Sequence, residues 1–580
     1  MSSCRKPAAD PPLVWSKTEI SVYIIYLAVA LLYAMDSVRR LGDELLDEGR
    51  LKPLYAGSLP FTDRRADWSD PQWNSFRLNL PILLVFACTH TVLSRFIRYY
   101  TGPRGYLAFQ LIVGVGYVLY LHRAYAVFLL GAVLANKITV ESMLRRGKDS
   151  VQFRWVPGTM WAINMGFLVA VRYYDGFRFA AIASWLSFFD QYVSPLLTFI
   201  VYNMVMLRMI SYVMDYYWAI RDRPPSTPRG TSELKDLESD EEDTGKGYKP
   251  VSPQGGDYKM RVRTNLPIRF YHSTALYMAY ILYAPLYVAG PILTFNAFVT
   301  YVYQPQTTFS VRKITIYAIR WVLCLFLMSL YQHYCWANII AKGSDSAQNL
   351  AGMSGPNLVF VSLFSLFFIW LKFVIIWRFF RLWALCDGVE TPENMTRCVF
   401  NNYSCTQFWR SWHRSYNQWL IRYIYIPLGG TKYKFLNIWV IFTFVAVWHE
   451  LQLQMLQWAW AVCAMMIPEI IVALTIQKQD WALPLRRSPW YKYLCALGAA
   501  MNILLLMSAN LIGFSYGPNG LHIVTNSIKR GFSWGPSIAL FLAFVAAAHV
   551  MLYVRQQEAL RKEWSAKSPV AMTPKMAAAE

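Results

Sequence analysis

The chain has 580 residues, of which 56% are apolar and only 16% are charged. Soluble domains carry about 25% charged residues, so this composition excludes an ordinary soluble enzyme. The 56 Lys and Arg residues outnumber the 34 Asp and Glu residues, which gives a net charge of +22. Because the basic residues lie in short stretches between apolar runs, they indicate the orientation of a membrane protein rather than nucleic-acid binding.

Apolar runs approach the length of about 20 residues that a helix needs to cross a bilayer. The sequence therefore predicts an all-α, polytopic membrane protein with about 11 to 13 crossings. A shorter apolar run at 178–190 predicts a re-entrant or interfacial helix. The predicted spans are 20–35, 79–97, 105–121, 125–141, 156–172, 196–219, 273–299, 314–339, 357–385, 435–450, 454–477, 492–514 and 536–555.

Polar interruptions divide the chain into five parts. Residues 1–78 hold an N-terminal leader, a first span and a polar loop, and residues 79–220 hold the N-terminal transmembrane helices. Residues 221–265 carry an acidic run with almost no large apolar residue, which predicts a disordered cytosolic loop. Residues 266–477 form the core that carries the motifs described below. Residues 478–580 hold the C-terminal transmembrane helices and a cytosolic tail.

Residues 387–434 are too polar to cross a membrane, yet they are rich in aromatic side chains. Large apolar residues recur there at steps of three and four, whereas basic residues lie mostly on the other faces. This pattern predicts an amphipathic helix lying in the membrane interface. The apolar positions are Trp409, Trp412, Tyr416, Trp419, Leu420 and Tyr423, and the basic ones are Arg410, Arg414 and Arg422.

Basic residues in the loops also predict the orientation. They concentrate in 387–434, in 478–487 and in the C-terminal tail, so we place all three on the cytosolic side. Residues 435–450 then cross outward. This places His449 at the lumenal end of a short helix and His413 at the cytosolic end of the region.

An ionisable residue near a membrane span is a candidate for function. His449 closes the apolar run NIWVIFTFVAVWH, and no metal-ligand residue follows it at binding spacing, so no metal site is predicted. An imidazole in this place can act as a general base toward a hydroxyl, or it can simply hydrogen-bond a neighbouring helix.

Several long segments resemble the membrane-bound O-acyltransferase (MBOAT) family. FWRSWHRSYNQWLIRYIYIPLGG (408–430), followed by VAVWHEL (445–451), resembles the signature of that family. YAPLYVAGPILTFNAF (283–298) and TRCVFNNYSCTQ (396–407) resemble the branch with fungal glycerol-uptake-type proteins and Hedgehog acyltransferases. The resemblance is greatest to the fungal members that reacylate lyso-glycosylphosphatidylinositol (lyso-GPI) anchors.

The resemblance implies a fold, a reaction and two catalytic residues. The fold is a curved helical bundle, of which 266–477 is the catalytic core, around a tunnel through the membrane. The catalytic residues are His449 and His413, the second at a position where Hedgehog acyltransferases have Asp. The reaction transfers a fatty acyl group from acyl-coenzyme A, with no required cofactor, to a hydroxyl of a lysolipid.

The acceptor implied by the fungal branch is the lyso-GPI anchor, in the endoplasmic reticulum membrane. Three alternatives stay open: a peptide palmitoyltransferase, an acyltransferase for glycerol or another lysolipid, and a proton-coupled glycerol transporter. The transporter has the support of histidines in a polytopic chain, but no internal repeat of the transporter kind is visible.

The coenzyme and a thiol suggest further candidate residues. Phosphates of acyl-coenzyme A need cations at the cytosolic mouth, which Arg410, Arg414, Lys432 and Lys434 can supply. The same residues can instead contact lipid headgroups. By resemblance to the Hedgehog branch, Cys398 is a candidate haem thiolate or lipidation site, with a plain free thiol as the alternative.

Overall fold

The structure is a computed structural model, which describes residues 13–222, 258–516 and 533–567 together with His522 and Asn526. Within these ranges, residues 53, 58, 146, 148, 175, 193–194, 265, 344–345 and 478 are outside the description. Residues 223–257 of the predicted disordered loop 221–265 lie outside the described residues. Its last part is ordered, since Tyr258–Val262 form a short helix in which Tyr258 and Arg261 are buried. The described chain is helical and has no strand, apart from one isolated bridge between Tyr55 and Ala66. The all-α prediction is confirmed.

Eight described helices are long and apolar enough to cross a membrane. Each coincides with a predicted span, and 79–97 and 105–121 fall together in one of them. The eight are α1 (Lys17–Asp47), α2 (Pro71–His122), α3 (Ala126–Leu144), α12 (Val311–Tyr334), α15 (Gly355–Cys386), α19 (Leu453–Thr475), α21 (Tyr491–Phe514) and α23 (Trp534–Lys567).

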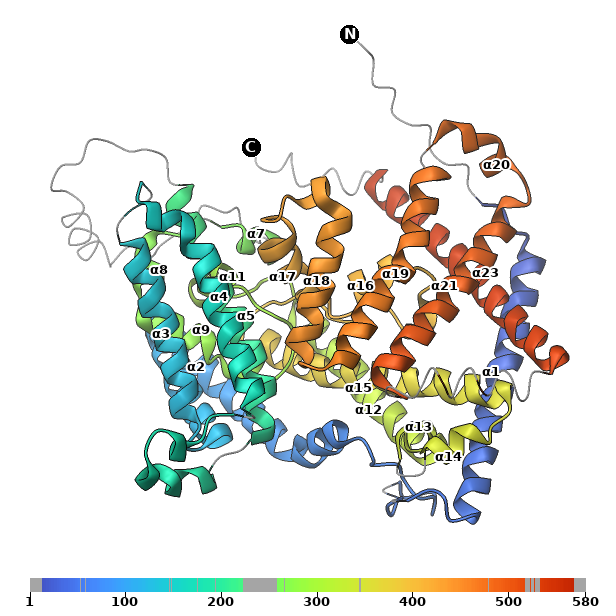
Figure 1. Ribbon diagram of the computed structural model, residues 1–580, viewed down its shortest axis with the longest axis horizontal. Coiled ribbons are helices and arrows are strands. Elements are labelled where there is room, and N and C mark those ends of the chain that lie inside the picture. Colours follow the sequence, from blue (N-terminus) through green and yellow to red (C-terminus); the bar gives the residue numbers. More distant parts are fainter. Residues whose placement is uncertain are drawn as a thin grey trace, which may run out of the picture.

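Three further predicted spans are helices that do not belong to these eight. They are α4 (Val151–Tyr173), α5 (Pro195–Arg221) and α18 (Lys434–His449), the last with only 16 residues. Figure 1 shows α4, α5, α18, α19 and α21 standing beside one another, with α15 crossing beneath the last three. The polytopic architecture is therefore confirmed, although fewer helices meet the length and hydropathy criteria than the 11 to 13 crossings predicted.

The predicted span 273–299 is not one helix. It forms α9 (Thr274–Ile281), α10 (Ala284–Tyr287) and the start of α11 (Phe295–Tyr303). Tyr277, Tyr283 and Phe295 are fully buried, so this apolar run lies inside the protein rather than against lipid. Irregular backbone at membrane depth is tolerated only where protein surrounds it or where it lines a cavity.

The remaining described helices are short. The run 178–190, predicted as re-entrant or interfacial, forms two 3-10 helices, η1 (Phe179–Ala181) and η2 (Ser184–Tyr192). The other short α-helices are α7 (Tyr258–Val262), α8 (Ile268–His272), α13 (Ala337–Lys342), α14 (Ser346–Ala351), α16 (Cys405–Ser411), α17 (Arg414–Leu420) and α20 (Leu483–Arg487).

Helix α2 is bent at a glycine. Gly102 has a φ of 67°, and Pro103 follows it, so the backbone leaves the helical conformation between the two predicted spans. The N-terminus of α2 is capped by the Asp70 carboxylate, which accepts a hydrogen bond of 2.7 Å from the Trp73 backbone N–H. The cap and the kink together fix where each half of α2 lies.

The prediction of one amphipathic helix in the interface is wrong. The segment is broken at Trp412–His413 into α16 and α17, and a π-helical turn, η4 (Ile421–Tyr425), follows α17. Trp419 and Tyr423 are fully buried, and the Trp419 indole N–H donates to the Leu207 carbonyl at 3.0 Å. These aromatic residues therefore pack inside the helical bundle, with α16 and α17 at mid-height in Figure 1.

Candidate active site

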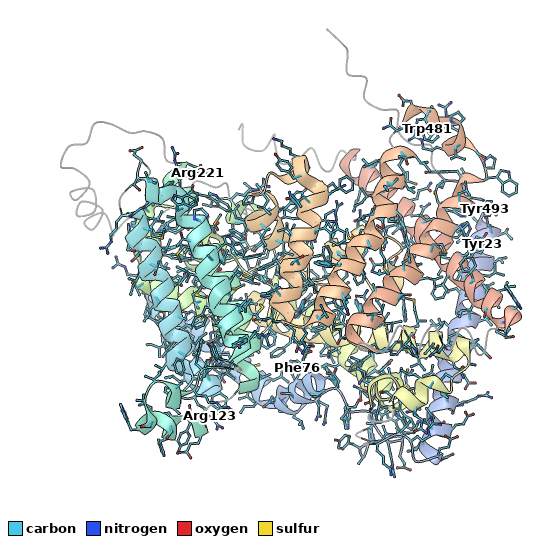
Figure 2. The ribbon with its side chains drawn as sticks, in the orientation of Figure 1. Tyr23, Phe76, Arg123, Arg221, Trp481 and Tyr493 are labelled. Carbon is cyan, nitrogen blue, oxygen red and sulfur yellow. The ribbon has the colours of Figure 1, made fainter. Side chains whose placement is uncertain are left out.

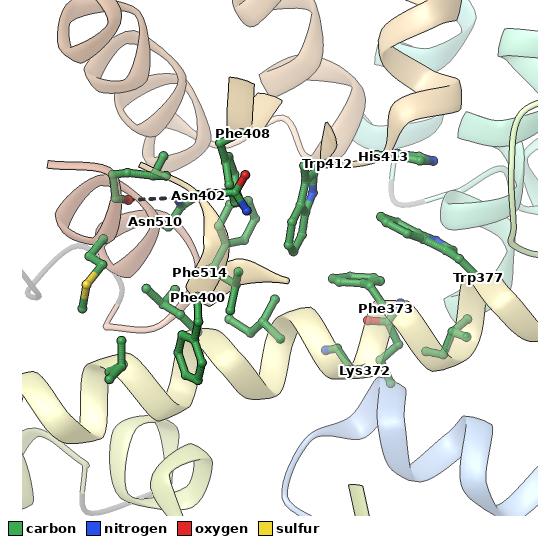
Figure 3. Close-up of a pocket in the computed structure, with 18 of the residues that line it drawn as sticks. Lys372, Phe373, Trp377, Phe400, Asn402, Phe408, Trp412, His413, Asn510 and Phe514 are labelled. Atoms are coloured by element: carbon green, nitrogen blue, oxygen red, sulfur yellow. Dashed lines mark hydrogen bonds between the residues drawn. The ribbon is translucent and has the colours of Figure 1, made fainter. Parts of the chain in front are cut away.

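A cavity of about 2450 Å³ lies among α1, α2, α5, α15, α17, α18, α19, α21 and α23. Its walls are mainly apolar, with aromatic residues such as Phe373, Trp377 and Phe408 beside a few polar ones (Figure 3). Small-molecule sites usually enclose about 300 to 1,000 Å³, so this cavity has room for more than one ligand. Both predicted catalytic histidines, His413 and His449, line it.

His413 is held in an uncommon backbone conformation. Its φ of 46° and ψ of 52° are left-handed, which is rare for a residue other than glycine. Asn394 stabilises the break between α16 and α17 by binding the two residues after His413. Its backbone carbonyl accepts a hydrogen bond from Arg414 N at 3.1 Å, and its side-chain Oδ1 accepts one from Ser415 N at 3.2 Å. The imidazole stacks on Trp377 with ring centroids 4.4 Å apart, so the ring is oriented against α15 (Figure 3).

His449 is the last residue of α18. Its carbonyl accepts a hydrogen bond of 3.1 Å from Arg172 Nη2, and its ring is exposed where it lines the cavity. Trp458 and Phe514 meet the ring edge to face, with centroids 6.3 and 6.4 Å away. Neither ring nitrogen of His449 hydrogen-bonds a described residue, so both are available to a substrate.

Two aromatic rings connect the histidines. Tyr416 lies 5.2 Å from His413 and 4.5 Å from Trp448, and the Trp448 ring lies 4.8 Å from His449, all between centroids. His413 was predicted at the cytosolic end of the region and His449 at the lumenal end of its helix. The structure buries His413 on the same cavity that His449 lines. The membrane side on which each histidine lies stays a prediction.

The cavity wall also carries buried polar atoms that have no hydrogen-bond partner among the described residues. A hydrogen-bonding group left unpaired in this way costs about 1–3 kcal/mol, so such atoms are candidates for contacts with substrate. They include His413 Nε2, Tyr416 OH, Trp409 Nε1, Trp458 Nε1, Asn203 Oδ1 and Asn402 Oδ1.

The four cations predicted to bind the coenzyme do not line the cavity. Arg410 and Lys432 are exposed, and Arg414 and Lys434 are half-buried. Lys432 belongs to the 3-10 turn η5 (Gly430–Tyr433) and Lys434 begins α18, at the end of that helix remote from His449. Their contact with acyl-coenzyme A stays a prediction.

Four other cations line the cavity, and none of them was predicted from the sequence. They are Arg123, Arg172, Lys342 and Lys372. Lys372 lies within the most apolar span, together with Arg378 and Arg381, and forms a 2.8 Å ion pair with Asp70. A charged residue in the middle of such a run was a signal that pointed to it. Desolvation, with the nearby charge of Lys372, lowers the pKa of Lys342 to about 8. Arg172, Asn203 and Tyr416 had no comparable signal, because only the fold brings them to the cavity.

Cys398 is half-buried beside η3 (Val399–Asn401) and does not line the cavity, although its neighbours Val399 and Phe400 do. Burial raises the pKa of its thiol, which disfavours the thiolate that binds haem iron. These features do not fit a haem site, and the attachment of haem or a lipid there stays a prediction. In the part of the chain that the structure describes, no three His, Cys, Asp or Glu side chains gather as metal ligands would.

A family model for the membrane-bound O-acyltransferase family matches residues 186–517, which include α5, both histidines and α21. The chain therefore belongs to this family and is an acyltransferase.

Known relatives agree with this assignment over most of the chain. It is 32% identical over 503 residues to the membrane-bound O-acyltransferase gup1 of Schizosaccharomyces pombe, covering 85% of this chain and 81% of the relative. The identity to GUP1 of Saccharomyces cerevisiae is 32% over 560 residues, covering 94% and 92%. The protein-cysteine N-palmitoyltransferase HHAT of Mus musculus is 28% identical over 202 residues, covering 33% and 38%.

Proposed function

We propose that this protein transfers a fatty acyl group from acyl-coenzyme A to a hydroxyl of a lysolipid. We further propose that the acceptor is the lyso-GPI anchor and that the reaction takes place in the endoplasmic reticulum membrane. The observation that carries the proposal is that His413 and His449 line one large, mainly apolar cavity.

In this proposal His449 acts as the general base. Its unpaired ring nitrogen takes the proton of the acceptor hydroxyl as the oxygen attacks the thioester carbonyl carbon. A C–O bond forms and the C–S bond breaks, and the proton passes from His449 to the departing thiolate. The products are the acylated lipid and free coenzyme A, so no oxidant or further reactant is needed.

His413 has a separate role, because hydrogen bonds aimed at the developing oxyanion stabilise the transition state. His413 Nε2 is buried without a described partner, on the wall that Tyr416 joins to Trp448 and His449. A protonated Nε2 can donate to the thioester carbonyl or to the pantetheine arm. The stacking on Trp377 restricts the ring, so little reorganisation is needed when the substrate binds.

The apolar part of the cavity suits a fatty acyl chain. Phe373, Phe408 and Phe514 lie on its walls together with aliphatic residues of α21 and α23 (Figure 3). Each buried methylene group of an acyl chain contributes about 0.8 kcal/mol of transfer free energy.

The acceptor is supported by likeness to the fungal branch. The fungal relatives match nearly the whole chain, whereas the protein-cysteine N-palmitoyltransferase matches a third of it. In addition, the chain has His413 where the Hedgehog acyltransferases have Asp. Both points favour a lipid hydroxyl over a peptide.

The test is to incubate purified protein with labelled acyl-coenzyme A and a panel of acceptors: lyso-GPI, other lysolipids, glycerol and a peptide with an N-terminal cysteine. Labelled GPI, absent with the His449→Ala variant, supports the proposal. Label on the peptide alone, or glycerol flux with no acylated product, contradicts it.

A further inference from the structure

The hydroxyl group of Tyr416 is buried on the cavity wall without a hydrogen-bond partner. The residue is 4% exposed, and its OH bonds no described residue. An unpaired buried hydroxyl costs stability, and a phenylalanine ring of the same shape would avoid that cost. A hydroxyl kept in this state on the wall of a substrate cavity points to a partner that arrives with the substrate.

Tyr416 lies between the two histidines. It belongs to α17 and comes three residues after His413, which is nearly one helical turn. Its ring centroid is 5.2 Å from that of His413 and 4.5 Å from that of Trp448, the residue directly before His449. Apart from His413 itself, no other unpaired side chain on the described wall contacts both of these rings.

Contacts on either side of Tyr416 fix its position. Ser415 Oγ accepts a hydrogen bond from Ile292 N at 2.8 Å, and the Trp419 indole donates to a carbonyl of α5 at 3.0 Å. Both of these side chains belong to α17, and the Tyr416 ring itself packs against Trp448. A donor held in this way needs little reorganisation when it meets a substrate.

The Tyr416 hydroxyl keeps its proton. Burial raises the pKa of this phenol well above its ordinary value, because the phenolate form would lose its hydration. His413 Nε2 is also unpaired and buried, and it donates when that nitrogen carries the proton. The wall therefore offers two neighbouring donors, one from each ring, to a single ligand.

An oxygen atom that gains negative charge during a reaction is the ligand that suits two such donors. Preorganised donors in a water-poor site stabilise charge where it develops in the transition state. In acyl transfer that charge develops on the carbonyl oxygen of the thioester. His449, on the same cavity, is the proposed base for the acceptor hydroxyl and is not needed for this contact.

We propose that Tyr416 is a catalytic residue whose hydroxyl, beside His413 Nε2, donates a hydrogen bond to the carbonyl oxygen of the acyl group. The inference rests on the proposed function, which brings the thioester to the histidines. When the acceptor oxygen adds to the carbonyl carbon, the carbonyl oxygen becomes an oxyanion, and the double bond forms again as the thiolate leaves. Tyr416 keeps its proton throughout, so the proton transfer through His449 is unaffected.

The Tyr416→Phe variant tests this role, because it removes the hydroxyl and keeps the ring. We expect kcat to fall by about 10²- to 10³-fold, the usual loss when one oxyanion donor is removed, with little change in KM for either substrate. The melting temperature should stay the same or rise, since no unpaired hydroxyl is buried any longer. A purely structural tyrosine predicts the reverse, a lower melting temperature with kcat unchanged.

The matched control is Tyr423→Phe in η4, the turn that follows α17. Tyr423 is equally buried but does not line the cavity, and its hydroxyl bonds Ser211 Oγ at 2.8 Å and Asp215 Oδ1 at 3.1 Å. The same substitution there breaks hydrogen bonds within the protein. It should therefore lower the melting temperature and leave kcat nearly unchanged.

Two further measurements examine the ligand atom. If Tyr416 and His413 donate to one oxygen, the losses from Tyr416→Phe and His413→Asn should not multiply in the double variant, because residues that act as a unit are not additive. An S-alkyl coenzyme A is a thioether with no carbonyl oxygen. Its affinity should be the same for the unaltered protein and for Tyr416→Phe.

Three results overturn the catalytic role of Tyr416. They are a kcat in Tyr416→Phe within about threefold of the unaltered enzyme, a fall in kcat matched by an equal loss of thioether affinity, and losses that multiply in the double variant. Failure of Tyr416→Phe to fold contradicts it as well, since an unpaired hydroxyl contributes nothing to the fold. Absence of acyl transfer by the unaltered protein to every acceptor refutes the proposed function instead.

Discussion

Replacing His449 with alanine should stop acyl transfer without harming the fold. The ring faces the cavity and hydrogen-bonds no described residue, so its removal should change the free energy of unfolding by less than about 1 kcal/mol. A positioned general base contributes about 10²- to 10⁴-fold to the rate, which corresponds to about 3 to 5 kcal/mol in the activation free energy. The two effects differ enough to be separated by measurement.

The matched control is His549→Ala in α23. His549 is 1% exposed and accepts a 3.1 Å hydrogen bond from Trp15 Nε1. Its ring stacks on that of Tyr23, which Figure 2 labels, with ring centroids 4.6 Å apart. His549 does not line the cavity. Its loss leaves the indole N–H unpaired, at a cost of about 1–3 kcal/mol in stability.

The assay combines initial rates of acyl transfer with thermal unfolding of the detergent-solubilised protein. His449→Ala should lower the rate and keep the melting temperature, and His549→Ala should do the reverse. More than about a tenth of the original turnover in His449→Ala would refute the role of general base, since a base is worth at least about a hundredfold.

Two further predictions concern stability and orientation. Arg422 forms an ion pair of 2.9 Å with Asp215, whose side chain is fully buried. Arg422→Leu leaves that carboxylate buried without its cation and should lower the free energy of unfolding, measured by chemical denaturation, by about 3–5 kcal/mol. A decrease below about 1 kcal/mol would contradict a stabilising role of the pair. Single cysteines at Lys432 and Leu451 should react with an impermeant reagent from opposite sides of sealed microsomes, because the 16 residues of α18 separate them. Labelling of both from one side contradicts the predicted orientation.

Length and apolar composition were enough to predict most of the helices, since a run such as 357–385 can hardly form anything else in a membrane protein. The same reasoning failed at 273–299. An apolar run contains no information on whether lipid or protein will cover it, and there the neighbouring helices do. Where the protein itself pairs the backbone polar groups, short broken helices replace one long helix.

The site was predicted in part for a similar reason. His413 and His449 could be named because short segments around them resemble a family signature. Arg422 was predicted to lie on the basic face of an amphipathic helix, yet it pairs with Asp215, which is 207 positions away in the sequence. Such a partner is set by tertiary packing, and one sequence does not reveal it. Arg172 and Asn203 were missed for the same cause, since each contacts α18 from a distant helix.

Substitutions of His413 can test both its left-handed backbone conformation and its side-chain hydrogen-bond donor. The left-handed conformation costs most residues about 1–2 kcal/mol, but asparagine tolerates it. Asparagine also keeps a side-chain N–H, so His413→Asn should retain both the chain break and part of the activity. Leucine provides neither, and His413→Leu should be less stable and almost inactive.

His413→Gly separates the two effects, because glycine accepts the left-handed backbone but has no donor. If the hydrogen bond matters, the glycine variant should fold as well as the asparagine variant and yet be about as inactive as leucine in acyl transfer. A glycine variant as active as asparagine would show that only the chain break is needed. A proton-coupled transporter predicts another outcome. Asparagine and leucine cannot carry a proton, so both variants would lose function equally, and glycerol flux would fall in parallel. That result, with no acyl product in any proteoliposome, would contradict the acyltransferase mechanism.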